Sequence, residues 1–257
     1  MKRDQKFMWV PTPTFLYRNY LYKKFSQVLD KNSYFLDVGA GNGEFVKYLL
    51  KQGFKGDYID ISEEAVKIAR GQLNGAKGIN IKQADIFTFK SNKKYDVIFS
   101  FETLEHIKND QLAMKKIYQL LKPGGTFLMS IPAHMSEWDK MDEIKGHFRR
   151  YERKELKEKL EKAGFLVETI LSYGFPFLWI LRRITKTGRL IKSFSKNLSK
   201  DAKTKESSIQ QEYDPRLKSL VTSPLILYPM FKIMDLFIKT DLGFGYIALS
   251  KKKSYPR

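Results

Sequence analysis

Residues 36–43 read Leu-Asp-Val-Gly-Ala-Gly-Asn-Gly, and this stretch decides the fold of the 257-residue chain. An apolar run stops at three glycines in alternate positions, Gly39, Gly41 and Gly43, and an amphipathic run begins at Glu44. The order is strand, tight turn and helix. Glycine permits positive φ and leaves room for a ligand beside the backbone, while the first N–H groups of the helix are available to bind it. The stretch therefore predicts a nucleotide-type cofactor site at the first strand of an α/β sheet.

The spacing of the glycines distinguishes between two kinds of cofactor. A dinucleotide fingerprint reads G-x-G-x-x-G, whereas this turn reads G-x-G-x-G and Glu44 occupies the next position. A carboxylate at the start of the helix repels a pyrophosphate, and Asp37 before the first glycine adds more negative charge. A cofactor that carries an amino group and a sulfonium fits this acidic turn better than NAD does.

The composition describes a basic protein with a net charge of +19, from 47 Lys and Arg against 28 Asp and Glu. Such a charge indicates either a lysine-rich surface or a polyanionic partner, nucleic acid or an anionic membrane. Nine of the basic residues fall in 182–205. The absence of cysteine excludes disulfides, thiolate zinc sites and a cysteine nucleophile.

The chain shows no signal-peptide pattern after Met1 and no apolar run of about 18 residues, the length that spans a bilayer. We therefore expect a cytoplasmic protein, with peripheral contact at the inner face of the membrane as the alternative.

Short apolar runs alternate with amphipathic stretches along most of the chain, which predicts a parallel, doubly wound sheet. Strands are expected at 34–38, 56–60, 79–82, 95–101, 126–131, 165–171 and 243–250. Helices are expected at 15–29, 44–52, from Ser62 onward, at 109–121 and at 152–163.

The βα rhythm stops before a long excursion. We expect an N-terminal helical segment at 1–31, a core formed by 32–172 and 243–253, and a helical insertion at 173–242. The insertion has apolar, aromatic ends around a polar stretch, 195–215, whose composition is typical of disorder. A lid over a hydrophobic substrate is the favoured interpretation. The alternatives are interfacial helices on an anionic leaflet and ordinary packing on the sheet edge.

Acidic residues follow the second and third strands, where a doubly wound sheet gathers its ligands. Asp60 ends the second strand, before Ile61, and a carboxylate there can accept hydrogen bonds from both ribose hydroxyls. Asp85 follows the third strand and can accept from an adenine amine, with Ile86 against the ring. The alternative for both acids is a turn or capping role, since Ser62 follows closely after the first.

Five stretches, taken in order, carry a resemblance to a known family. They are LDVGAGNG (36–43), YIDIS (58–62), QADIF (83–87), YDVIFSFETLEHI (95–107) and LLKPGGTFLMSIP (120–132). Together they resemble motifs I to VI of the class I S-adenosylmethionine-dependent methyltransferases, in the branch that includes ubiquinone-biosynthesis and other small-molecule enzymes. The resemblance implies a Rossmann-like, doubly wound, seven-stranded sheet with an antiparallel last strand.

The same resemblance implies S-adenosylmethionine as the cofactor. The residues that would contact it are Asp37, Gly39, Gly41, Gly43, Asp60, Ile61, Asp85 and Ile86, with Phe101 and Glu102 lining its methionine end. His106 belongs to a Leu-Glu-His tripeptide frequent in this branch, and it either approaches the sulfonium or caps the following helix.

The loop after the fifth strand is predicted to face the methyl acceptor. It holds His134 and His147, and a histidine with a pKa of about 6.5 is a natural general base for a hydroxyl. Both are candidate catalytic residues, and the alternative is that His147 and Arg149 fix the loop to the following helix by polar contacts. Candidate substrate-binding residues are Trp138, Arg149, Arg150 and Tyr151. The two arginines can hold a phosphate or carboxylate, or they are ordinary solvated side chains.

The expected activity is O-methylation of a small-molecule, glycan or lipid-linked acceptor with a hydrophobic or anionic part. The histidines and carboxylates show no metal-ligand spacing, so a metal-independent enzyme is expected. RNA methylation is an alternative favoured only by the charge, because Ser-Phe-Glu-Thr at 100–103 replaces the Asn/Asp-Pro-Pro-Tyr/Phe motif of base-amine methyltransferases. A membrane-surface protein that binds the cofactor without chemistry is a further alternative.

Overall fold

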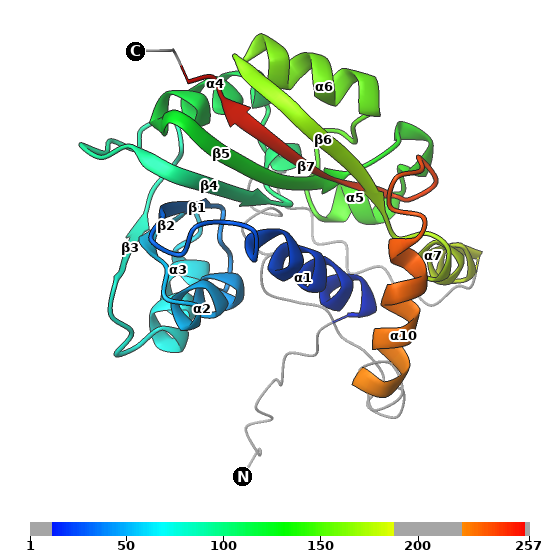
Figure 1. The fold of residues 1–257 in the computed structure, drawn as a ribbon. Helices are drawn as coiled ribbons and strands as arrows, with labels where there is room; N and C mark the ends of the chain where they lie inside the picture. The colour runs from blue at the N-terminus through cyan, green and yellow to red at the C-terminus, as the bar shows by residue number, and fades with distance from the viewer. Residues whose placement is uncertain (1–11, 188–222, 255–257) are drawn as a thin grey trace.

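The computed structural model describes residues 12–187 and 223–254 (Figure 1). The polar stretch 195–215 and the basic residues from 189 to 205 lie outside the described residues. Within them, one sheet contains β1 (Tyr34–Val38), β2 (Lys55–Asp60), β3 (Ile79–Gln83), β4 (Tyr95–Phe101), β5 (Leu121–Pro132), β6 (Phe165–Tyr173) and β7 (Gly245–Lys252). The helices are α1 (Pro13–Ser26), α2 (Glu44–Lys51), α3 (Glu63–Gln72), α4 (Asp110–Leu120), α5 (Lys140–Ile144), α6 (Arg153–Lys162), α7 (Phe177–Thr187) and α10 (Pro224–Asp235), with 3₁₀ turns η1 (Leu104–His106) and η2 (Met135–Glu137).

The strand order is β3-β2-β1-β4-β5-β7-β6. The first five strands pair in parallel, and β7 lies antiparallel between β5 and β6. The predicted seven-stranded, doubly wound sheet with an antiparallel last strand is therefore confirmed. Because β1 pairs with both β2 and β4, the chain switches direction there, and ligands of such sheets bind at this switch point.

The local sequence explains the elements that position the site. Four of the five residues of β1 are buried, as expected of a strand covered on both faces. Gly43, at φ 79°, precedes α2, which turns Phe45 and Leu49 into the core. Ser62 caps α3 by accepting a hydrogen bond from the Ala65 N–H at 3.2 Å, so the predicted helix start is confirmed.

Helices cover both faces of the sheet and bury two hydrophobic cores (Figure 1). One core receives side chains from α4 and α6, and the other from α1, α2, α3, α7 and α10. The insertion therefore contributes to the second core. The ring of Phe231 on α10 lies 4.9 Å from that of Tyr17 on α1, and Asp235 accepts hydrogen bonds from Tyr17 and Tyr20.

The insertion leaves and rejoins the sheet at neighbouring points. Tyr173, the last residue of β6, pairs with Gly245, the first residue of β7. This arrangement places α7 near the start of α5, where Arg182 pairs with Asp139, and places α10 against α1 (Figure 1). None of the described helices has both the length and the apolar character needed to cross a membrane.

Candidate functional site

The turn between β1 and α2 is built by three glycines in the left-handed region, with φ of 71°, 56° and 79°. A Cβ at Gly39 would collide with Thr103, and one at Gly43 would lie 3.2 Å from Ala69. At Gly41, a Cβ would meet nothing within 4 Å. Gly39 and Gly43 therefore permit close packing, whereas Gly41 borders the open space where the predicted ligand would lie.

Asp60 holds this turn from the end of β2. Its Oδ2 accepts a hydrogen bond from the Gly41 N–H at 2.9 Å, and its Oδ1 accepts from the Ser62 N–H at 2.8 Å. Burial raises the pKa of Asp60, against the opposing effect of these hydrogen bonds. A carboxylate has further lone pairs for ribose hydroxyls, so its turn role and its predicted cofactor role are compatible. The cofactor role stays a prediction.

Asp37 adds a second acidic group beneath the turn. Burial, and then the charge of Asp60, raise its pKa to about 8. Its side chain makes no hydrogen bond within the described part of the chain. A cationic ligand would stabilise the ionised form of Asp37 and offset its repulsion by Asp60.

The predicted adenine end shows a turn aspartate and one core residue. Asp85 Oδ1 accepts a hydrogen bond from the Phe87 N–H at 2.7 Å, which is the turn role left open above. Ile86 is buried in the core beside β1, whereas Ile61 is exposed. Their predicted contacts with a cofactor are not tested by this geometry.

A polar network lies at the end of β4. Glu102 has φ of 52°, unusual for a residue with a side chain, and such strain is typical of functional sites. Its carboxylate accepts hydrogen bonds from Ser130 Oγ at 2.9 Å and from the Tyr173 hydroxyl at 2.8 Å, and it forms an ion pair with Arg18. Burial acts to raise the pKa of Glu102, but Arg18 and the hydrogen bonds outweigh it and hold the pKa below its usual value.

Helix α1 supplies two site residues that the sequence did not predict. Arg18 forms the ion pair just described, and the ring of Tyr22 stacks on Phe101 at 3.6 Å. The Tyr22 hydroxyl lies 2.6 Å from Ser130 Oγ. The i, i+4 spacing of Arg18 and Tyr22 shows that they share a helix face, but nothing in the sequence identifies what that face covers.

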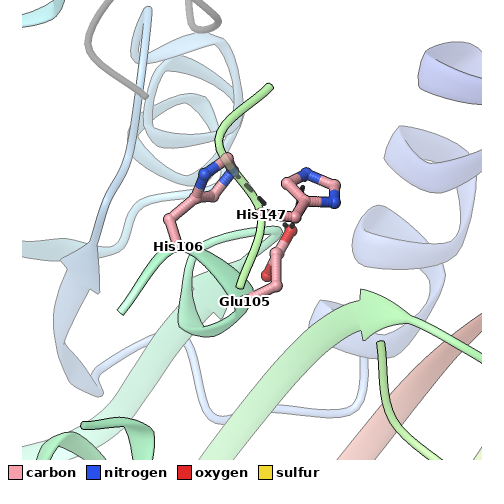
Figure 2. Close-up of side chains that lie close together, drawn as sticks. All are labelled: Glu105, His106 and His147. Carbon is pink, nitrogen blue, oxygen red and sulfur yellow. Dashed lines mark ion pairs between the residues drawn. The ribbon is translucent and has the colours of Figure 1, made fainter. Parts of the chain in front are cut away.

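Three side chains from two distant segments converge beyond the end of β4 (Figure 2). They are Glu105 and His106 of η1 and His147 of the loop after α5, and their ligand atoms all lie within 4.8 Å of one another. Glu105 Oε1 is 3.9 Å from His106 Nε2 and 4.0 Å from His147 Nε2. The two imidazoles meet edge to face, with ring centroids 4.6 Å apart. We call this group the Glu105 cluster.

The carboxylate of Glu105 is fully buried, and neither of its oxygens has a hydrogen-bond partner among the described residues. Burial, and then the charge of Glu102, raise its pKa well above the usual value. An unpartnered buried carboxylate is costly. The cluster therefore needs either a proton on Glu105 or a cation beside it.

The orientation of His147 is fixed by Asp142. His147 Nδ1 lies 2.8 Å from Asp142 Oδ1, and Arg150 Nε donates to Asp142 Oδ2 at 3.0 Å. Burial acts to raise the pKa of Asp142, but the hydrogen bonds from His147 and Arg150 lower it below its usual value. Because the carboxylate only accepts, Nδ1 carries the proton and Nε2, 4.0 Å from Glu105 Oε1, carries the lone pair.

Both imidazoles of the cluster are neutral near pH 7. Burial lowers the pKa of His147, against the opposing effect of Asp142. Burial, and then His147 and Lys145, lower the pKa of His106 to about 3. Two neutral imidazoles and one carboxylate are a donor set that suits zinc and other first-row transition metals. The sequence does not reveal this group because His147 lies 41 residues beyond His106.

The other candidate catalytic residue, His134, is not brought to the cluster. Its Nδ1 lies 3.0 Å from Glu152 Oε2, and its Nε2 lies 3.1 Å from the Asp241 carbonyl oxygen. Both ring nitrogens are therefore engaged in connecting the loop to α6 and to the segment before β7.

The candidate substrate-binding residues are mostly engaged within the chain. Arg149 forms an ion pair with Asp110, which also accepts a hydrogen bond from the Tyr151 hydroxyl at 2.8 Å. Arg150 is buried against Asp142, and Trp138 is half-buried. These contacts match the structural alternative weighed above, and substrate binding by these residues stays a prediction.

Comparisons with known proteins agree with one another. The chain is 38% identical over 97 residues to the ubiquinone biosynthesis O-methyltransferase of Rickettsia canadensis (strain McKiel), covering 37% of this chain and 41% of the relative. It is 32% identical over 97 residues to the malonyl-acyl-carrier-protein O-methyltransferase 2 of Ilyobacter polytropus, covering 37% of this chain and 38% of the relative. The matched part thus spans about two fifths of these curated relatives.

A solved structure confirms the fold. The phosphoethanolamine N-methyltransferase 2 of Haemonchus contortus, in complex with S-adenosyl-L-methionine, is 17% identical to this chain with a TM-score of 0.61, covering 95% of this chain and 54% of that one. The family follows from a longer sequence match. Residues 16–170 match the model of a methyltransferase domain, so the chain belongs to the methyltransferase-domain family, whose cofactor is the S-adenosylmethionine expected from the sequence.

Proposed function

We propose that this protein transfers the methyl group of S-adenosylmethionine to a hydroxyl of a small-molecule or lipid-linked acceptor. The observation that carries the proposal is the placement of two sites at the ends of β1 and β4. The open glycine turn held by Asp60 lies at one, and the Glu105 cluster follows the other by only a few residues. The O-methyltransferase names of the two matched relatives support oxygen as the acceptor atom.

The chain's residues divide the work on the cofactor. Asp60 and the backbone at Gly41 would bind the ribose of the cofactor. The negative charges of Asp37 and Asp60 would attract its positively charged amino acid end. Arg18 and Glu102 would close over the methionine end, because α1 carries Arg18 across the end of β4. Rigid placement of the methyl carbon opposite the acceptor is the main contribution a protein makes to such a displacement.

The Glu105 cluster would activate the acceptor. Glu105, His106 and His147 would hold a divalent cation, which would supply Lewis-acid activation of the acceptor hydroxyl. Methyl transfer would form the bond from the hydroxyl oxygen to the methyl carbon and break the carbon–sulfur bond, with the electron pair left on sulfur and the hydroxyl proton passed to solvent. Asp142 keeps the proton on His147 Nδ1, which would leave the Nε2 lone pair for the cation. The unpartnered Glu105 carboxylate is the reason for departing here from the metal-independent enzyme expected from the sequence.

Metal binding is expected at about one Mn²⁺ or Co²⁺ per chain, measured by electron paramagnetic resonance or calorimetry on the full chain. Glu105→Gln keeps the side-chain shape but removes the charge, so binding should be lost. Glu143→Gln, at an exposed position on α5, is the matched control and should bind as the wild type does. Absence of binding to the wild type, together with methyl transfer that survives chelation, would leave His147 acting as the base itself.

The affinity for S-adenosylmethionine is expected to rise with pH between about 6 and about 7.5, below the range where an α-amino group loses its proton. Asp37, with a pKa of about 8, must lose its proton to face a cation, so affinity falls by up to about tenfold per pH unit as the pH drops. Calorimetry in buffers of different ionisation enthalpy measures how many protons are released when the cofactor binds. Asp37→Asn should flatten the pH dependence, and an unchanged slope in that variant contradicts the assignment. No measurable binding at any pH would refute the proposed function.

RNA methylation rests on the net charge alone. It stays an untested alternative.

A further inference from the structure

Exposed apolar side chains are concentrated on the two helices of the insertion. Ten of the sixteen large apolar residues that are exposed in the described part of the chain lie between Phe177 and Leu242. Both helices also contribute to the second core through Leu178 and Leu227. The two helices are therefore packed on the core, and their exposed apolar residues form additional faces directed away from it.

Helix α7 exposes a complete apolar stripe. Phe177, Ile180, Leu181 and Ile184 follow the spacing i, i+3, i+4, i+7 and have exposed fractions of 37%, 46%, 37% and 60%. A stripe with this spacing normally faces a core. Here Leu178 is the buried residue, so the stripe faces away from it.

Helix α10 is apolar on two sides. Its buried side presents Phe231 and Met234 to α1 and the sheet. On the remaining surface, Leu225 is 88% exposed, Ile226 is 50% exposed, and Leu236 directly after the helix is 77% exposed. A helix that is apolar nearly all round needs an apolar environment beyond its own core contact.

The two helices are fixed relative to each other and to the loop between β5 and α6, residues 133–152, which we call the acceptor loop. Phe175 before α7 packs against Phe237 after α10, with ring centroids 5.2 Å apart. Arg182 on the opposite side of α7 donates to the Glu137 carbonyl oxygen at 2.9 Å and forms an ion pair with Asp139, the N-cap of α5. The apolar stripe of α7 therefore lies on a helix anchored beside the loop that leads to His147 (Figure 1).

We propose that α7 and α10 dock this protein on an anionic lipid leaflet, through the stripe of α7 and the exposed side of α10. Charge selects this partner. The chain between the helices, 188–222, carries eight Lys and Arg against four Asp and Glu, and the whole chain has a net charge of +19. Apolar helix faces together with basic residues are what binds an anionic leaflet. A second copy of a chain with this charge would instead bring like charges together.

Membrane docking also indicates a substrate class. This step rests on the proposed function. Because the Arg182 side of α7 is anchored to Glu137 and Asp139, a leaflet bound to the stripe on the other side lies one helix diameter, ~10 Å, from the acceptor loop. An acceptor with a hydroxylated head and an apolar tail can remain in the leaflet while its head reaches the Glu105 cluster. The acceptor class that fits is an amphipathic lipid or a lipid-linked compound.

Vesicle co-sedimentation of the full chain tests the docking surface. The test variant combines Ile184→Glu, Leu225→Glu and Leu236→Glu. The matched control combines Val28→Glu, Leu112→Glu and Leu166→Glu, which are exposed apolar positions outside the insertion. Both variants change the net charge equally, so a difference between them reports position and not charge.

Wild type is expected to bind vesicles of phosphatidylglycerol and phosphatidylcholine, and to bind pure phosphatidylcholine at least about tenfold more weakly, because each basic residue near an anionic surface contributes to binding. The test variant should lose at least about tenfold in partitioning, since it removes buried apolar area, and the control should bind as wild type does. Equal binding of the two variants would overturn the proposal, as would wild type that ignores anionic vesicles. A wild-type dimer that only the test variant dissociates, seen by light scattering, would assign the surface to a second copy. S-adenosylmethionine binding, measured in parallel, reports the cofactor site separately.

Discussion

Replacement of His147 by Ala is expected to lower kcat/KM for methyl transfer by about 10³, because it removes one of the three proposed ligands of the activating cation. Lewis-acid activation is worth several kcal/mol, and about 1.4 kcal/mol corresponds to a factor of ten in rate. The variant removes the Nε2 atom that lies 4.0 Å from Glu105 Oε1 and leaves that buried carboxylate with one imidazole neighbour fewer. Asp142 keeps its ion pair with Arg150, so the loop has a remaining anchor. Initial rates at saturating cofactor, with S-adenosylhomocysteine release as the readout, measure the effect.

His134→Ala is the matched control, because it removes the other histidine of the same loop. Its ring nitrogens face Glu152 and the Asp241 carbonyl and not the cluster. We expect its kcat/KM to stay within about threefold of wild type, with any loss appearing in the melting temperature. A larger loss of rate in His134→Ala than in His147→Ala would reverse the assignment of the two residues.

Replacement of Asp60 by Ala is expected to weaken S-adenosylmethionine binding by about 100-fold, or about 2.7 kcal/mol. The carboxylate holds the Gly41 and Ser62 N–H groups and has lone pairs left for the ribose. Hydrogen bonds to a charged group are worth about 1.5–3 kcal/mol each, so losing the turn anchor and a ligand contact together gives this magnitude. Calorimetry on the purified variant provides the measurement.

Two further variants make the Asp60 result specific. Asp30→Ala removes an exposed turn carboxylate, which accepts from the Asn32 N–H, and it should leave cofactor affinity unchanged. Asp60→Asn keeps an acceptor oxygen and should lose less affinity than Asp60→Ala. Cofactor affinity in Asp60→Ala equal to that of wild type would mean that Asp60 only holds the turn.

The sheet was predictable because its determinants are local. The apolar run before Gly39 defines β1, and the amphipathic run that begins at Glu44 defines α2. Each pattern lies inside the element that it predicts. The seventh strand was expected in antiparallel orientation only through the family resemblance, since periodicity does not specify strand direction. The short helix α5 was not predicted, because its single turn depends on Asp139 capping and not on an apolar pattern.

The site was predictable only in part, for a physical reason. Residues at strand ends, such as Asp60 and Glu102, could be placed because parallel strands end at a common edge. The contacts of Arg18 with Glu102 and of His147 with Glu105 join segments 84 and 42 residues apart. Such contacts depend on how α1 and the acceptor loop dock on the sheet, and neither segment carries a local signal for its partner.

The pairing of Tyr173 with Gly245 has a consequence for how the protein can diverge. Because the 174–244 segment starts and ends at adjacent ladder positions, a tight hairpin turn of two to about five residues could join β6 to β7 directly. The segment can therefore be replaced by one of different length and sequence without altering the strand order of the sheet. Such a replacement would remove the contacts of Phe231 and Asp235 with α1. Since α1 also carries Arg18, a new segment could alter the exchange rate of the cofactor as well as the choice of acceptor.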